Sequence, residues 1–137
     1  FEGLIEFIES TVFGLINQIV SQEEDGLRQL RAIVAMLLGF AERNPGMTRV
    51  LIGDALVTED GRLQDRINQL IDRIETSLRQ SFRNAVTQGR LPQDTEIQVR
   101  AGIALAFVLG RWLRFAKSGF RRAPTESIEQ QIALLFV

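Results

Sequence analysis

Apolar residues recur at spacings of three and four along most of the chain, which is the period of an α-helix with one buried face. Asn44-Pro45-Gly46 interrupts this pattern, because proline disfavours helical backbone in the residue before it. No segment alternates as a half-buried strand does, so the pattern predicts an all-α fold of about six helices. We expect helices over residues 1–20, 26–44, 47–53 and 60–87, a fifth through residues 101–109, and a sixth after Pro124.

The apolar positions of the first, second and fourth helices each fall on one stripe, and these stripes are expected to form the core. Asp94 or Thr95 can cap the fifth helix, and Thr125 can cap the sixth. Glu75 and Arg79 are spaced as an i,i+4 ion pair on the solvent side. The expected core residues are Leu4, Ile5, Ile8, Val12, Leu15, Ile16, Ile19, Leu27, Leu30, Val34, Leu37, Ala41, Leu63, Ile67, Leu70, Ile74, Leu78 and Phe82.

The segment Ala101–Leu109 is apolar on every side of its helix, which leaves no face for water. One side must meet the core of its own chain, and another must meet a partner chain. We therefore expect a homodimer held together by the last two helices. The residues expected to be buried between the two chains are Leu105, Val108, Trp112, Ile128, Ile132 and Leu135.

Phe7 lies about 120° from the centre of the first stripe, so it flanks the core instead of filling it. Met36, Gly39 and Arg43 lie together on one flank of the second helix, with Ala32. If the two helices pair antiparallel, these flanks line a shallow groove with an arginine at one end. Such a groove suits an extended or partly helical peptide with an acidic or carboxylate end. The alternative is that Phe7 and Met36 pack on neighbouring helices.

The amino-acid composition argues against several classes of function. The 137 residues suit one domain, and 17 acidic against 16 basic side chains argue against a free-standing nucleic-acid binder. The chain has no histidine and no cysteine, which excludes an imidazole base, a thiolate nucleophile and metal sites built on those ligands. We expect a protein that is not an enzyme, with no metal and no cofactor.

Two charged segments are weaker candidates for binding. Residues 23–25, Glu-Glu-Asp, have the carboxylates for a cation, although such a run is usually solvated. Arg121 and Arg122, near Lys117, can touch phosphate, although basic residues at a helix C-terminus are commonly there for the helix alone.

The longest apolar run indicates whether the chain spans a membrane, and its two ends indicate whether it is part of a longer protein. Ala101–Leu109 is about half of what a bilayer span needs, so we expect no transmembrane helix. The chain opens at Phe1 in a helical pattern and closes inside an apolar stripe at Val137. We therefore expect a piece of a longer protein.

Residues 38–49 (LGFAERNPGMTR) and 62–70 (RLQDRINQL) resemble the TetR family of helix-turn-helix regulators, and within it the branch of nucleoid occlusion factors. Residues 4–9 resemble the helix that follows the DNA-binding domain of this family. The resemblance is strongest over residues 1–79 and looser over 85–111. It implies that residues 1–137 are a C-terminal regulatory and dimerisation domain, with the N-terminal helix-turn-helix domain absent from the chain.

The resemblance also implies partners and a location. Nucleoid occlusion factors are cytoplasmic, nucleoid-associated homodimers that, on DNA, bind the division protein FtsZ and inhibit septum assembly over the chromosome. Their site for the FtsZ C-terminal tail would fall here on the predicted groove. The family has an arginine where this chain has Leu15. The implied tail-binding residues are Phe7, Met36, Gly39, Arg43 and Asn44.

A ligand-responsive TetR-type repressor is the alternative function. It requires a small-molecule effector pocket inside the helical bundle, of about 300 Å³ or more, with converging polar groups. Candidates for those polar groups are Asn17, Thr48, Asn68 and Gln69.

Overall fold

The computed structural model describes residues 2–53 and 61–137, and within them it has helices and no strand. The all-α prediction is confirmed. Asp60, where we expected the fourth helix to begin, lies outside the described residues. The helices are α1 (Glu2–Gln22), α2 (Gly26–Arg43), α3 (Pro45–Leu51), α5 (Gly61–Thr87), α6 (Ile97–Lys117) and α7 (Ile128–Leu135).

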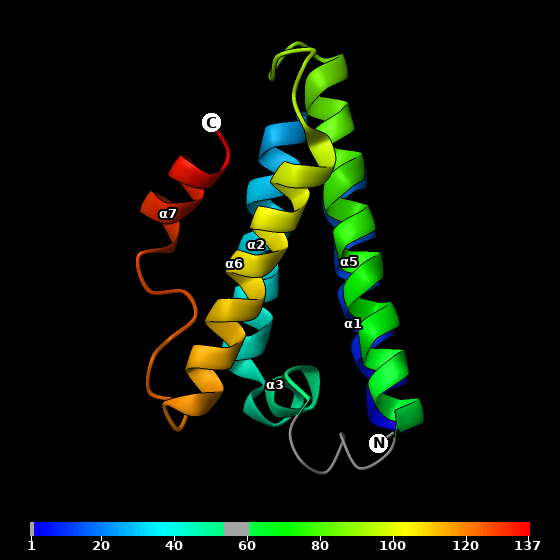
Figure 1. Ribbon diagram of the computed structural model, residues 1–137, viewed down its shortest axis with the longest axis vertical. Coiled ribbons are helices and arrows are strands. Elements are labelled where there is room, and N and C mark those ends of the chain that lie inside the picture. The colour runs from blue at the N-terminus through cyan, green and yellow to red at the C-terminus, as the bar shows by residue number, and fades with distance from the viewer. Residues whose placement is uncertain (1, 54–60) are drawn as a thin grey trace.

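Helix α2 is the centre of the bundle, because it contacts each of the other five described helices. Figure 1 shows α1 and α5 on one side of it and α7 on the other, with α6 crossing in front of it and α3 at the end where α2 stops. The α2 positions Leu30, Val34 and Leu37 are fully buried, as their spacing predicts. The stripe of α5 from Leu63 to Phe82 is buried as well, so the predicted core of both helices is confirmed.

The helix caps differ from those expected. The N-cap of α6 is Glu96, not Asp94 or Thr95, and that of α7 is Ser127, not Thr125. The Thr125 hydroxyl instead donates to the carboxylate of Glu42, on α2. Which residue caps a helix depends on where the first turn begins. Tertiary packing sets that position, and the local sequence does not specify it.

The polar contacts between α2 and α5 were not predicted. The buried Gln29 side chain accepts hydrogen bonds from the Ser81 hydroxyl (3.0 Å) and from the Asn84 amide (3.1 Å). The Gln88 amide oxygen accepts from the backbone N–H of Gly26 at 2.8 Å. These bonds fix the register of the two helices, because each satisfies a buried or half-buried polar group.

Asp25 caps α2 and provides a prediction for stability. Its carboxylate accepts from the backbone N–H of Leu27 (2.9 Å) and Arg28 (3.1 Å) and pairs with Arg90 (2.9 Å). The hydrogen bond from Arg28 is the main cause that holds the pKa of the Asp25 carboxyl below its ordinary value. Asp25→Ala is therefore expected to lower the free energy of unfolding at neutral pH by about 1 kcal/mol.

Urea unfolding between neutral and strongly acidic pH measures this contribution. Because the pKa is lowered by folding, the stabilisation is present above the ordinary pKa of about 3.9 and is lost as the pH falls through the folded value. The wild type should there approach Asp25→Asn, because a protonated carboxyl, like the amide, keeps an acceptor oxygen but carries no charge. Asp25→Asn, which does not titrate, should retain most of the stability that Asp25→Ala loses. Equal losses in both variants would contradict the role of the cap.

One described helix, Gly3–Gln22, is long and apolar enough for a membrane span by length and composition, with a mean hydropathy of 1.3. Its residues Ile5, Ile8, Val12 and Ile16 pack in the core, and a core helix of this length meets the same criterion. The expectation of no transmembrane helix stays a prediction.

Candidate functional site

Phe7 lies on the outward face of α1. Its side chain is 54% exposed, and the neighbouring Gly3 and Gly14 are exposed as well. The buried side of α1 is formed by residues such as Ile8 and Val12, which have almost no exposed surface. The alternative in which Phe7 packs on a neighbouring helix is therefore wrong for this residue. A phenyl ring left in water is available to a partner.

The candidate residues of α2 lie on its half-exposed flank. Met36 is half-buried and packs against the core, so for Met36 the alternative holds in part. Arg43 is exposed, and its guanidinium has no hydrogen-bond or ion-pair partner within residues 2–53 and 61–137. A Cβ on Gly39 would come within 3.2 Å of Nη1 of Arg43. The missing side chain of Gly39 thus makes room for Arg43 to lie along the helix.

Asn44 has a structural role. It ends α2 and begins α3, and its side-chain amide donates to the carbonyl of Phe40 at 2.8 Å. The backbone carbonyl of Asn44 is also occupied, because it accepts from the backbone N–H of Thr48 at 3.0 Å.

Helices α1 and α2 run antiparallel and are joined by residues 23–25, so the start of α1 and the end of α2 lie at the same end of the bundle (Figure 1). Phe7 and Arg43 are therefore both at that end. Among the described residues no hydrogen bond or ion pair joins the α1 and α2 members of the predicted site. Leu15 is half-buried on α1 and adds an apolar side chain to that helix.

Of the six residues expected at the dimer interface, three are buried inside the protomer and three are half-buried. The expectation is therefore wrong for the three buried ones. Val108 and Trp112 are 0% and 1% exposed within the protomer, and Ile132 is 6% exposed. The indole N–H of Trp112 donates to the carbonyl of Leu37 at 3.1 Å. These three side chains are covered by their own chain and offer no surface to a partner. The half-buried remainder is Leu105, Ile128 and Leu135.

The opposite face of α6 is the exposed apolar one. Val99 and Ile103 are each 55% exposed and Leu113 is 47% exposed. Ala106 and Gly110, also exposed, complete a continuous stripe at spacings of four and three. We call these five residues the α6 stripe. This side of α6 is uncovered within the protomer, and its residues are not the ones expected at the dimer interface. That a partner chain covers it stays a prediction.

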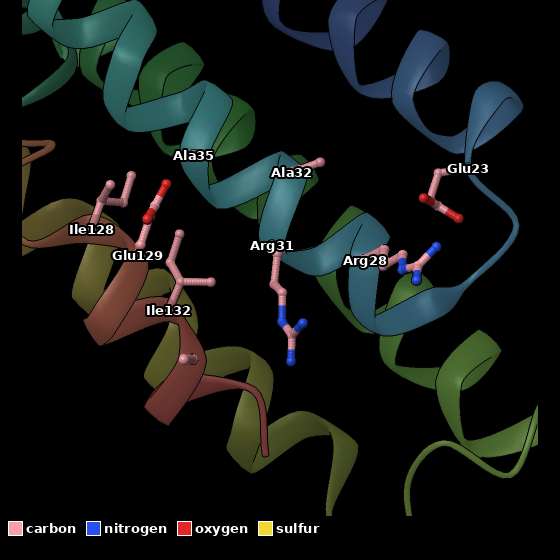
Figure 2. Close-up of a pocket in the computed structure, with 9 residues that line it drawn as sticks. Glu23, Arg28, Arg31, Ala32, Ala35, Ile128, Glu129 and Ile132 are labelled. Atoms are coloured by element: carbon pink, nitrogen blue, oxygen red, sulfur yellow. The ribbon is translucent and has the colours of Figure 1, made fainter.

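A hollow of about 610 Å³ lies between α2 and α7 (Figure 2). Figure 2 shows Ile128 and Ile132 of α7 opposite Ala35 and Arg31 of α2. Ala32 lines this hollow, so this residue does not belong to the Phe7 side alone. The hollow is on the outer surface, not inside the bundle.

The polar residues considered for an effector pocket do not converge. Thr48 is fully buried, and its hydroxyl donates to the carbonyls of Ala41 (2.9 Å) and Asn44 (3.0 Å). Asn17, Asn68 and Gln69 are exposed at the surface. Within the described part of the chain, no group of three or more acidic side chains could hold a metal ion.

Comparison with known proteins identifies the family. A family model described as the tetracyclin repressor-like, C-terminal domain of SlmA-like proteins matches residues 24–137. The chain is 47% identical over 135 residues to the nucleoid occlusion factor SlmA of Vibrio vulnificus (strain YJ016), covering 98% of the chain and 69% of the relative. It is 46% identical over 135 residues to SlmA of Vibrio cholerae serotype O1, with the same coverage. SlmA of Cronobacter sakazakii is 46% identical over 135 residues, covering 98% of the chain and 68% of the relative.

The fold and these matches agree, since a helical bundle without strands in its described residues is what a TetR-like C-terminal domain requires. The similarity extends over nearly the whole chain and includes both α1, with Phe7, and the end of α2, with Arg43. The chain belongs to the family of SlmA-type nucleoid occlusion factors, within the TetR-like regulators.

Proposed function

We propose that this chain is the regulatory and dimerisation domain of a DNA-bound inhibitor of cell division. In this proposal an N-terminal helix-turn-helix domain, joined to the start of α1, holds the protein on the chromosome, so that it is cytoplasmic and nucleoid-associated. The domain formed by residues 1–137 recruits the C-terminal tail of FtsZ. The observation that carries the proposal is the exposure of Phe7 at the same end of the bundle as Arg43, whose guanidinium has no partner among the described residues.

The chemistry of the two side chains suits an acidic peptide. An exposed phenyl ring supplies apolar contact area, and an exposed arginine can pair with a carboxylate through two parallel hydrogen bonds. Met36 and Gly39, half-exposed on α2, add an apolar wall and a position without a side chain. The Asn44 amide is held by Phe40, so it contributes through its position more than through a free donor.

Dimerisation is supported by the α6 stripe. Val99, Ile103 and Leu113 leave large apolar side chains in water on one helix face, and such a face is typical of a protein–protein interface. A two-fold pairing covers the same stripe on both protomers. We propose that the homodimer forms through α6 with α7, and that the α6 stripe is its centre.

Titration of a fluorescent FtsZ C-terminal tail peptide tests the partner site. The full-length protein, bound to a DNA duplex carrying its site, should bind the peptide saturably. Phe7→Ala and Arg43→Ala should each raise the Kd about tenfold or more, because each removes a central contact of a small interface. Fluorescence anisotropy gives the Kd directly.

Matched controls separate a local effect from a general one. Val20→Ala removes an exposed apolar side chain from the other end of α1, and Arg83→Ala removes an exposed arginine from α5. Both should leave the Kd within about twofold, as surface substitutions outside the contact do. Unchanged binding in Phe7→Ala and Arg43→Ala would show that the tail binds elsewhere.

A further inference from the structure

The C-terminal end of α6 and the turn after it form a concentrated positive charge. Residues 111–122 contain five of the chain's 16 basic residues and none of its 17 acidic ones. The formal net charge of the whole chain is only −1, so the remainder is acidic. We call Arg114, Lys117, Arg121 and Arg122 the basic end; all four are exposed.

The helix dipole accounts for only half of this charge. Arg114 and Lys117 lie in the last turn of α6, where cations stabilise the negative helix terminus. Arg121 and Arg122 follow the helix, beyond the short reach of that effect. Their presence in the turn therefore needs another reason.

The turn that carries them is held by specific contacts. The Ser118 hydroxyl oxygen accepts from the backbone N–H groups of Arg121 (3.3 Å) and Arg122 (2.9 Å). Phe120, at a positive φ of 64°, places its ring 5.1 Å from that of Phe115 in an edge-to-face arrangement. The backbone under the two arginines is thus anchored to α6, while their side chains reach solvent.

The cations of the basic end are largely uncompensated. Arg122 lies 3.8 Å from Glu126, both on the surface. Within residues 2–53 and 61–137, Arg114, Lys117 and Arg121 have no ion-pair partner. Beside them is a hollow of about 310 Å³, lined by Lys117 and Gly119. Guanidinium and ammonium groups around a hollow favour a phosphate oxygen.

The location of the basic end indicates the partner. Figure 1 shows the C-terminal end of α6, α3 and the start of α1 at the same end of the long axis. We propose that the basic end contacts the phosphate backbone of the DNA that the N-terminal domain holds. This inference rests on the proposed function, because the domain joined to the start of α1 brings DNA to this side. It adds a second, sequence-independent DNA contact in the regulatory domain.

The salt dependence of DNA binding tests the inference. Full-length protein is titrated with a duplex carrying its site and with a random duplex of equal length, at roughly 50 to 200 mM salt. In Lys117→Gln/Arg121→Gln/Arg122→Gln, the slope of log K against log[salt] should become less negative by about one for each phosphate that the variant no longer neutralises. Affinity for both duplexes should fall by the same factor, because phosphates carry no sequence information.

The matched control is Arg28→Gln/Arg31→Gln/Arg83→Gln, which removes the same charge from exposed arginines. They belong to the first turns of α2 and the last turns of α5, and these helix ends lie at the opposite end of the bundle (Figure 1). Its slope should equal that of the wild type. Circular dichroism and sedimentation show that both variants keep the fold and the oligomeric state.

A wild-type slope in the basic-end variant would overturn the inference while leaving the proposed function intact. If that variant also loses FtsZ-tail binding, the basic end is assigned to an acidic protein segment. Absence of DNA binding by the wild type at every salt concentration would overturn the proposed function and this inference together.

Discussion

Gly26→Ala is expected to lower the free energy of unfolding by about 3 kcal/mol, at the upper end of what overpacking a tight contact costs. A Cβ on Gly26 would lie 2.4 Å from the backbone nitrogen of Ala85 and 2.7 Å from the carbonyl oxygen of Ser81. These atoms belong to the backbone of α5, so no side-chain rotation relieves the clash. The two helices would have to separate, and the hydrogen bonds of Gln29 to α5 would lengthen with them.

Urea unfolding followed by circular dichroism measures this loss. Gly14→Ala is the matched control: Gly14 lies in the middle of α1, and a Cβ there would meet nothing within 4 Å. Alanine should stabilise that helix by about 0.5 to 1 kcal/mol, because glycine loses more backbone entropy on folding. If Gly26→Ala unfolds at the same urea concentration as the wild type, α2 and α5 do not approach as closely as described.

Ile103→Asp is expected to convert the proposed dimer into a folded monomer. Ile103 is 55% exposed on the α6 stripe, so the fold of the protomer does not need its side chain. A two-fold interface contains the substitution twice, and each copy loses the burial of an isoleucine, about 1.5 to 3 kcal/mol. The dimer Kd should therefore rise by at least about 100-fold. Sedimentation velocity over a range of protein concentrations measures the shift.

Two further substitutions to aspartate make this experiment discriminating. Val20→Asp puts the same charge on an exposed position of α1, 39% accessible, and should leave the dimer intact. Val108→Asp, on the covered side of α6 and 0% exposed, should unfold the protein because it buries an unpaired carboxylate. If Ile103→Asp sediments as the wild type does, the α6 stripe is not the interface.

Much of the fold follows from local pattern. The three-and-four spacing from Leu63 to Phe82 identifies both the helix and its buried side, because an amphipathic helix has one apolar face to cover. Pro45 interrupts the helical backbone between α2 and α3, because its ring disfavours helical geometry in the residue before it. The exposure of Phe7 is predictable in the same way, since its angle from the stripe of α1 places it away from the core.

Sequence pattern could not identify the contacts that close the bundle. Gly26 touches Ala85, and Gln29 bonds Ser81 and Asn84, across more than fifty residues of chain. Nothing near Gly26 distinguishes it from a glycine that merely begins a helix. Its requirement for a missing side chain comes from the position of α5.

The sequence by itself determined that this protein is a bundle of helices. It also determined that one helix, through residues 101–109, is apolar on every side, which is more apolar surface than the core of one chain can cover. Only the tertiary structure decided which side of that helix is covered. Val108 and Trp112 face the protomer while Ile103 and Leu113 face solvent, and all four are large apolar side chains. Periodicity relates residues within one helix, but a helix that is apolar all round has no preferred angle. Its orientation is set by the neighbours it packs against, here α2 and α5, which come from distant parts of the chain.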